Sequence, residues 1–247
     1  MRISFDSNAW EKIFDPRDAS CASIREALRS GRIKGFICAT SFRIEAVRRR
    51  DRVRYFANPH ITAQNNLVIR DGQPWLRMSV MPDSRRHPGL PLVQLDKLEQ
   101  ALSVGVRLMY GCNWMGLPEP REFLDRTIFV QETLEERHDR EQRMYDVIAR
   151  IEARGVGKTA FDAAGGWGMP PKESLNAKKL ASACAEWADG ELAASHIAYR
   201  NDILCTNDRA GNAGTSIFDA QNRTWLTNEF DVSFKTVDEL LAIATDS

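Results

Sequence analysis

The sequence predicts an α/β protein built on a Rossmann-like parallel sheet flanked by helices. Apolar runs with the length of buried strands occur at residues 2–5, 33–38, 202–206 and 232–235. Helical patterns alternate with these runs, and such alternation favours parallel strands joined by helical crossovers. The chain of 247 residues is long enough for one large domain, or for a core with a sizeable insertion.

The first elements form a strand–helix–strand–helix series. The strand at 2–5 is followed by a helix over 18–31, and the strand at 33–38 is followed by a helix that carries Glu45 in its first turns. Thr40 or Ser41 is expected to cap that second helix. This start is typical of a parallel sheet.

The middle of the chain has a different pattern, which predicts an insertion of mixed α/β structure over 56–171. A hairpin is expected around the Asp71-Gly72 turn, since strand-like runs flank it. Helices are expected at 94–110 and 132–154. The Gly/Pro-rich stretch 155–171 is the clearest linker.

The α/β pattern returns in the last part of the chain. Helices are expected over 172–187 and 189–200 before the third strand, and a short helix over 236–244 after the last one. The core domain is therefore predicted to combine residues 1–55 with residues 172–247.

The composition limits the classes of partner and the compartment. Lys plus Arg and Asp plus Glu both number 34, so any nucleic-acid binding must come from a local basic patch. The five cysteines are scattered and odd in number, which favours reduced thiols in a cytoplasmic protein. The strand-like start indicates no secretory signal, and no apolar run approaches the ~20 residues of a membrane span.

Four carboxylates fall where the predicted core elements would bring them together. Asp6 closes the first strand, and Asp208 lies just past the third. Glu45 lies early in the helix after the second strand, and Asp189 begins the helix that leads into the third. Because the carboxyl ends of parallel strands share one edge of a sheet, we expect these acids to share one crevice.

Clustered carboxylates are the oxygen ligands that magnesium prefers, and such an ion can activate a bound water. Mg²⁺ or Mn²⁺ is therefore the expected cofactor, with all four acids as metal ligands and catalytic residues. Glu186 or Glu191 is an alternative to Asp189, or an addition to it, since Glu186 lies one turn earlier on the same face. Capping and turn roles for the acids are the competing interpretation. The polar neighbours expected to orient the carboxylates are Ser7, Asn8, Thr206 and Asn207.

Arginines crowd the segment after Glu45. Arginine binds phosphate bidentately and stacks on bases, so these side chains would steer a nucleic acid into the acidic crevice. A solvated helix face with local ion pairs to Glu45 and Asp51 is the alternative. The residues predicted to bind substrate are Arg48, Arg49, Arg50 and Arg52.

Both ends of the chain resemble a known family. The segment Asp6-Ser7-Asn8-Ala9-Trp10, the acidic helix with Asp189 and Glu191, and the strand end Thr206-Asn207-Asp208 are similar to motifs of PIN-domain nucleases. The closing segment 234–241 is similar to that family's last strand and helix. The resemblance implies a metal-dependent endoribonuclease directed at single-stranded or looped RNA, either a toxin with a protein antitoxin or an RNA-processing enzyme. The middle of the chain has no counterpart in a minimal domain of this kind.

Two other functions remain open from the sequence. One is a non-catalytic PIN-like scaffold that binds nucleic acid or protein. The other is a DNA-directed, structure-specific nuclease. The sequence also leaves the oligomeric state open between a monomer and a homodimer.

Overall fold

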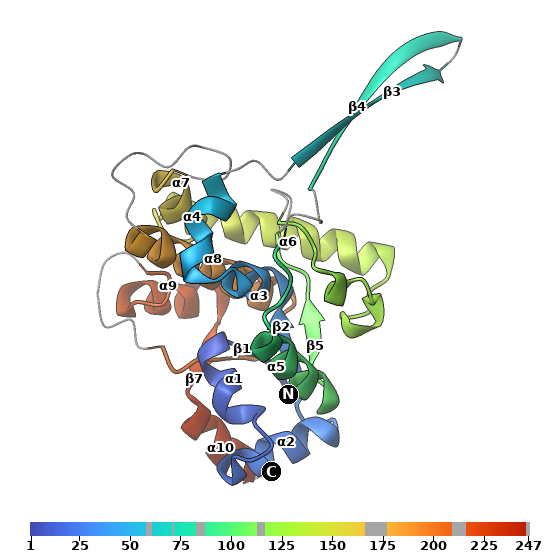
Figure 1. Ribbon diagram of the computed structural model, residues 1–247. Helices are drawn as coiled ribbons and strands as arrows, with labels where there is room; N and C mark the ends of the chain where they lie inside the picture. Colours follow the sequence, from blue (N-terminus) through green and yellow to red (C-terminus); the bar gives the residue numbers. More distant parts are fainter. Residues whose placement is uncertain are drawn as a thin grey trace.

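A five-stranded parallel sheet forms the centre of the protein (Figure 1). The computed structural model describes residues 1–57, 61–70, 72–82, 87–112, 117–165, 177–208 and 216–245. In spatial order, the sheet contains β5 (Arg107–Met109), β2 (Lys34–Cys38), β1 (Arg2–Phe5), β6 (Ile203–Cys205) and β7 (Ser233–Lys235). The expectation of an α/β protein with a parallel sheet is confirmed.

The register of the sheet aligns the carboxyl ends of β1 and β6. Ile3 pairs with Ile203, and Phe5 pairs with Cys205. The backbone N–H of Asp6 then donates to the Cys205 carbonyl at 3.0 Å. Residues that follow the two strands therefore lie side by side, although about 200 positions separate them in the chain.

Helices cover both faces of the sheet and bury its alternating side chains. One face packs against α1 (Ser7–Ile13), α2 (Ala22–Arg29), α5 (Leu92–Ser103) and α10 (Val237–Thr245). The other face packs against α6 (Leu134–Ala153), α8 (Ala177–Ala198) and α9 (Ala220–Phe230). Short 3₁₀ turns lie at Ala19–Cys21, Arg121–Phe123 and Arg126–Ile128.

A smaller apolar cluster joins three further helices to the first turns of α8. The helices are α3 (Ala39–Ala46), α4 (Arg49–Ala57) and α7 (Lys158–Ala163). Phe56, Phe161 and Trp187 form its aromatic centre, and the Phe161 and Trp187 rings lie 4.7 Å apart. This cluster fixes α3 and α4 against the helix that carries Asp189.

The expected hairpin is present and projects away from the rest of the protein (Figure 1). Its strands are β3 (Ile61–Arg70) and β4 (Gln73–Pro82), paired antiparallel with Leu67 opposite Leu76. Gly72 lies in the turn with φ of 74°, a left-handed conformation that suits glycine. Asp71 lies outside the described residues.

Three predicted boundaries differ from the structure. The helix expected at 94–110 ends at Ser103, and its last part is strand β5, which joins the main sheet. The range 56–171 is therefore not a separate insertion, because it supplies an edge strand of the core sheet. The helix α3 begins at Ala39 with Cys38 as its N-cap, so the cap predicted at Thr40 or Ser41 is wrong.

The helices expected at 172–187 and 189–200 form one helix, α8. The predicted break between residues 187 and 189 is wrong, because both residues lie inside α8. Gly190, also inside the helix, serves a close contact. A Cβ at Gly190 would lie 3.0 Å from the Cα of Gly157. Within the described ranges, no helix is long and apolar enough to cross a membrane.

Candidate functional site

Asp6 lies at the carboxyl end of β1 and is also the N-cap residue of α1. Its carboxylate accepts hydrogen bonds from the Ser7 backbone N–H, the Asn8 side-chain amide and the Thr206 hydroxyl, each at 2.6 Å. The side chain is buried, and this burial raises the pKa of Asp6, while the Thr206, Ser7 and Asn8 bonds offset part of the effect. The carboxylate is thus held in one orientation.

The start of α1 and the segment after β6 are tied together by side chains that the sequence places beside the acids. The side-chain oxygen Oδ1 of Asn8 accepts a hydrogen bond from the Asn207 backbone N–H at 2.8 Å, and the Thr206 hydroxyl accepts one from the Asp208 backbone N–H at 3.0 Å. The Asn207 side chain accepts from the Val237 N–H at 3.1 Å, at the start of α10. These contacts set the position of the Asp208 backbone relative to Asp6.

Glu45 lies on α3 and faces the end of β1. The Ser7 hydroxyl donates to Glu45 Oε1 at 3.0 Å. Burial first, and the nearby Asp6 charge second, raise the pKa of Glu45 to about 7. Ser7, Arg52 and Lys97 act in the opposite direction. Glu45 therefore exchanges its proton near neutral pH when no cation is bound.

Asp189 lies in the middle of α8 and is half-buried. Its surroundings raise its pKa well above the usual value, first through burial and then through the charges of Asp6, Glu45, Glu186 and Asp208. Within the described part of the chain, its carboxylate accepts no hydrogen bond. An ionised carboxylate at this place has a strong need for a cation.

Three of the four predicted acids line one small cavity at the carboxyl edge of the sheet: Asp6, Glu45 and Asp189. Its volume is about 10 Å³, roughly the room that one water molecule needs. The Ser41 hydroxyl, which also lines the cavity, donates to the Ala188 carbonyl at 2.6 Å. This bond links α3 to α8 and so links the helices that carry Glu45 and Asp189.

The fourth acid, Asp208, is not one of the residues that line the cavity. It is close enough to act on Asp6 and Asp189 electrostatically, since its charge contributes to raising the pKa of both. The backbone of Asp208 is held by Arg223, whose guanidinium donates to the Asp208 carbonyl and to the Phe218 carbonyl. The sequence gives no signal for Arg223, which reaches the site from α9.

The donor set suits a hard divalent cation in kind, because carboxylate and hydroxyl oxygens are the ligands of Mg²⁺ and Mn²⁺. In the ranges that the structure covers, however, no three Asp, Glu, His or Cys side chains converge into a preformed metal centre. Cation binding at this place would require the carboxylates of Glu45, Asp189 and Asp208 to close on the ion around Asp6.

The two glutamates that the sequence offers in place of Asp189 have other partners. Glu186 Oε1 accepts from the backbone N–H groups of Gly157 at 3.0 Å and Ile217 at 2.7 Å. Glu191 Oε2 accepts from the Cys112 N–H at 2.7 Å. Both carboxylates anchor loops against α8, so neither replaces Asp189 in the cavity.

The predicted substrate arginines divide into two groups. Arg49 and Arg50 are exposed and line a cavity of about 310 Å³ between α4 and α8, together with Lys178, Ala181 and Ser182. No acidic side chain lines this cavity within the described ranges. The sequence gives no signal for Lys178, because only tertiary packing brings the start of α8 beside α4.

Arg52 has a structural role that excludes it from the substrate-binding group. It is buried and donates to the backbone carbonyls of Val47 at 2.8 Å, Ala181 at 3.1 Å and Glu45 at 3.4 Å. Arg52 therefore connects the cationic cavity to the acidic one through fixed contacts. Arg48 is exposed and lines a separate cavity that also contains Asp51.

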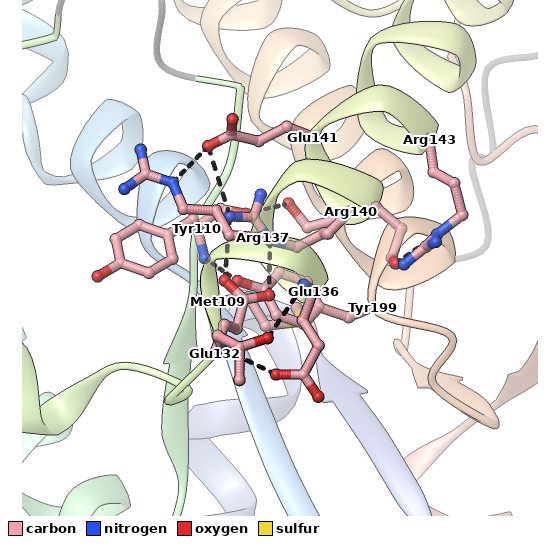
Figure 2. Close-up of polar contacts among 12 residues, drawn as sticks. Met109, Tyr110, Glu132, Glu136, Arg137, Arg140, Glu141, Arg143 and Tyr199 are labelled. Carbon is pink, nitrogen blue, oxygen red and sulfur yellow. Dashed lines mark hydrogen bonds and ion pairs between the residues drawn. The ribbon is translucent and has the colours of Figure 1, made fainter.

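Another cleft lies beside α6 and contains several arginines (Figure 2). Arg140 donates to both carboxylate oxygens of Glu132, at 2.8 and 3.1 Å, and Arg137 donates to Glu141 at 2.8 Å. Figure 2 shows these pairs around the end of β5, where the Tyr199 hydroxyl accepts from the backbone N–H of Tyr110 at 3.1 Å. Glu132 and Glu141 pair with Arg140 and Arg137, so both of these guanidiniums already have carboxylate partners.

Comparisons with protein-family models, curated proteins and solved structures gave no significant match. The function of the protein is therefore inferred from its fold and from the geometry of the acidic cavity.

Proposed function

We propose that this protein is an endoribonuclease that uses Mg²⁺ or Mn²⁺ to hydrolyse phosphodiester bonds of single-stranded or looped RNA. The observation that carries the proposal is the shared cavity of Asp6, Glu45 and Asp189 at the carboxyl edge of a parallel sheet, with Asp208 beside it. Ligand sites of open α/β sheets occur at this edge. The resemblance of both chain ends to PIN-domain nucleases agrees with this assignment.

Asp6, Glu45, Asp189 and Asp208 would hold the ion, which would supply an activated water for attack on phosphorus. Asp6 is the fixed member of the group, because three donors hold its carboxylate. Glu45 is oriented by Ser7, and its pKa of about 7 places its proton exchange in the neutral range. Asp189 has the strongest electrostatic need for a cation.

The cationic cavity supports a single polynucleotide strand as the substrate. Arg49, Arg50 and Lys178 present positive charge to this space, and no acidic side chain lines it within the described ranges; Arg50 also forms an exposed ion pair with Asp51 at 3.8 Å. Ala181 precedes Asp189 by eight residues on α8, which corresponds to about 12 Å at the helical rise. A flexible single strand can cover that distance. Some of its phosphates would bind at the cationic cavity while another phosphate of the same strand enters the acidic cavity.

The test is cleavage of a circular single-stranded RNA, which only an endonuclease can open. Wild type is expected to cut it with Mg²⁺ or Mn²⁺ and to lose activity in excess chelator. Asp6→Asn and Asp189→Asn are each expected to reduce cleavage at least about 100-fold, because each removes a charge that holds the ion. Glu99→Gln, on the exposed face of α5, is the matched control and should cut at the wild-type rate.

The same assay separates RNA from DNA. Matched circular single-stranded DNA and a flapped DNA duplex are offered under identical conditions. Faster cleavage of either DNA substrate would contradict the choice of RNA, and metal-independent cleavage would contradict the use of the acidic cavity.

A non-catalytic scaffold is the second candidate, and one observation favours it: the described acids do not form a preassembled metal centre. Calorimetric titration with Mn²⁺ distinguishes the two functions. A nuclease site should lose Mn²⁺ affinity in Asp6→Asn and Asp208→Asn. Equal affinity in wild type and both variants, combined with no cleavage, would establish the scaffold.

A further inference from the structure

The projecting hairpin of β3 and β4 has one apolar face. In an antiparallel pair, directly opposite residues share a face, as do residues two positions away. Leu67 pairs with Leu76, Ile69 pairs with Pro74, and Asn65 pairs with Met78. Five of these six side chains are apolar, and none is charged. We call them the arm face: Asn65, Leu67, Ile69, Pro74, Leu76 and Met78.

The arm face is open to water in the isolated chain. Leu67 is 72% exposed, Leu76 70%, Ile69 66% and Met78 66%. Figure 1 shows the hairpin extending away from the helices and the sheet. Exposed large apolar side chains that are contiguous on one face mark an interaction surface. A two-stranded hairpin also needs a partner layer for stability in water.

We propose that the arm face packs against the arm face of a second copy of this chain, which makes the protein a homodimer. Two hairpins related by a two-fold axis would form a small two-layer sandwich, the arrangement that buries the apolar sides of paired sheets. With antiparallel arms, Leu67 and Leu76 lie at the centre of the contact. This inference is independent of the nuclease proposal.

The charge and the size of the arm face favour a second copy as the occupant. The face contains no charged group, so self-pairing buries no like charges, and the whole chain has a formal net charge of zero. Five apolar side chains at roughly 100 Å² each would bury about 1,000 Å² in total over two copies, which reaches the lower limit of specific interfaces.

The face on the opposite side of the hairpin provides matched controls. Asn66, Val68, Gln73 and Trp75 belong to it by register, and all four are exposed. A substitution there changes the same two strands without changing the arm face. The five native cysteines are all buried, so a cysteine introduced on the hairpin is the accessible thiol.

The first experiment is crosslinking of the full chain with a short bis-maleimide, since packed sheets lie about 10 Å apart. Leu76→Cys is expected to give a covalent dimer in high yield. Val68→Cys, which would lie on the outer side of the sandwich, is expected to give little covalent dimer. Equal crosslinking of the two variants would overturn the proposed arrangement.

The second experiment is light scattering coupled to size exclusion. Wild type is expected at twice 28.0 kDa, and the double variant Leu67→Asp with Leu76→Asp at the monomer mass. Because two-fold symmetry places each new charge in the contact twice, the dimer Kd should rise at least about 100-fold. The control, Asn66→Asp with Gln73→Glu, adds the same charge on the other face and should remain dimeric. A monomeric wild type, or a dimer that survives the arm-face charges, would refute the proposal.

Discussion

Replacing Glu45 with glutamine should stabilise the protein when no divalent cation is bound. In the wild type at pH 8, the Glu45 carboxylate is ionised, although burial and the Asp6 charge oppose its ionisation. Glutamine has nearly the same shape and keeps a carbonyl oxygen that can accept the Ser7 hydroxyl bond. Glu45→Gln therefore removes an unfavourable charge and retains the contacts of the side chain.

The size of the effect follows from the pKa of Glu45. It is raised from 4.5 to about 7 in the folded protein, and this interval corresponds to about 3 kcal/mol of lost stability once the group is ionised. A carboxyl with a raised folded pKa binds more protons in the native state between pH 4.5 and 7. Wild-type stability therefore falls as pH rises through that window, and the stabilisation by Glu45→Gln should be present at pH 8 and nearly absent at pH 4.5. For a chain of this size, about 3 kcal/mol corresponds to a Tm increase of roughly 6–12 °C.

The assay is thermal unfolding in chelator at pH 8 and pH 5, followed by titration with Mn²⁺. Glu99→Gln, the same change at an exposed position of α5, is the control and should leave Tm unchanged at both pH values. At 100 times its Kd, Mn²⁺ should stabilise wild type by about 2.7 kcal/mol, and Glu45→Gln clearly less. The electrostatic account would be refuted if Glu45→Gln had the same Tm as the wild type at pH 8. It would also be refuted if the substitution raised Tm by the same amount at both pH values.

Two further predictions concern other parts of the protein. His196 is buried, with its Nδ1 atom 3.0 Å from the Ser4 hydroxyl oxygen, and burial lowers the pKa of His196 from 6.5 to about 4. As pH falls from 6.5 to 4, the unfolded chain takes up this proton before the folded protein does. Urea unfolding should therefore show that the free energy of unfolding of the wild type falls by up to about 3 kcal/mol relative to His196→Gln over that range. The control His138→Gln, at an exposed position, should show no such difference from the wild type. For the cationic cavity, Arg49→Glu and Lys178→Glu should each weaken single-stranded RNA binding in chelator and lower the salt slope by about 0.7 per lost phosphate contact. The control Arg32→Glu, just before β2, should leave the RNA affinity measured by fluorescence anisotropy unchanged. Equal losses of affinity in all three variants would contradict a local phosphate site.

The strands of the sheet were predictable because their residues are buried on both faces. A short run such as Ile3-Ser4-Phe5, with two large apolar side chains and only the small Ser4 between them, predicts a buried strand between Arg2 and Asp6, and β1 covers the expected residues. Asp6 and Asp208 follow from the same signal, since a strand end fixes the residue after it. The edge strand β5 gave no such signal, because three residues after an amphipathic helix continue its apolar pattern.

Long-range packing explains the predictions that failed. The predicted boundary between the helices 172–187 and 189–200 lies inside α8, where the nearby Gly190 allows contact with Gly157. Arg52 looks like part of a basic surface, yet its three carbonyl partners lie on two helices that the sequence does not place together. Glu186 and Glu191 have the right spacing for the site, and only the tertiary structure gives them backbone partners.

The acidic cavity combines one fixed acid with others that lack equal support, and this difference has a physical consequence. Asp6 receives three hydrogen bonds, from Ser7 and Asn8 at the start of α1 and from Thr206 just after β6, so its position costs the protein little beyond burial. Asp189 receives none within the described residues, and four carboxylates raise its pKa. A cation would relieve the repulsion at Asp189 more than at Asp6. Metal binding should therefore order the α8 side of the cavity more than the β1 side, and hydrogen exchange should slow most around Asp189 when Mn²⁺ is added to the wild type.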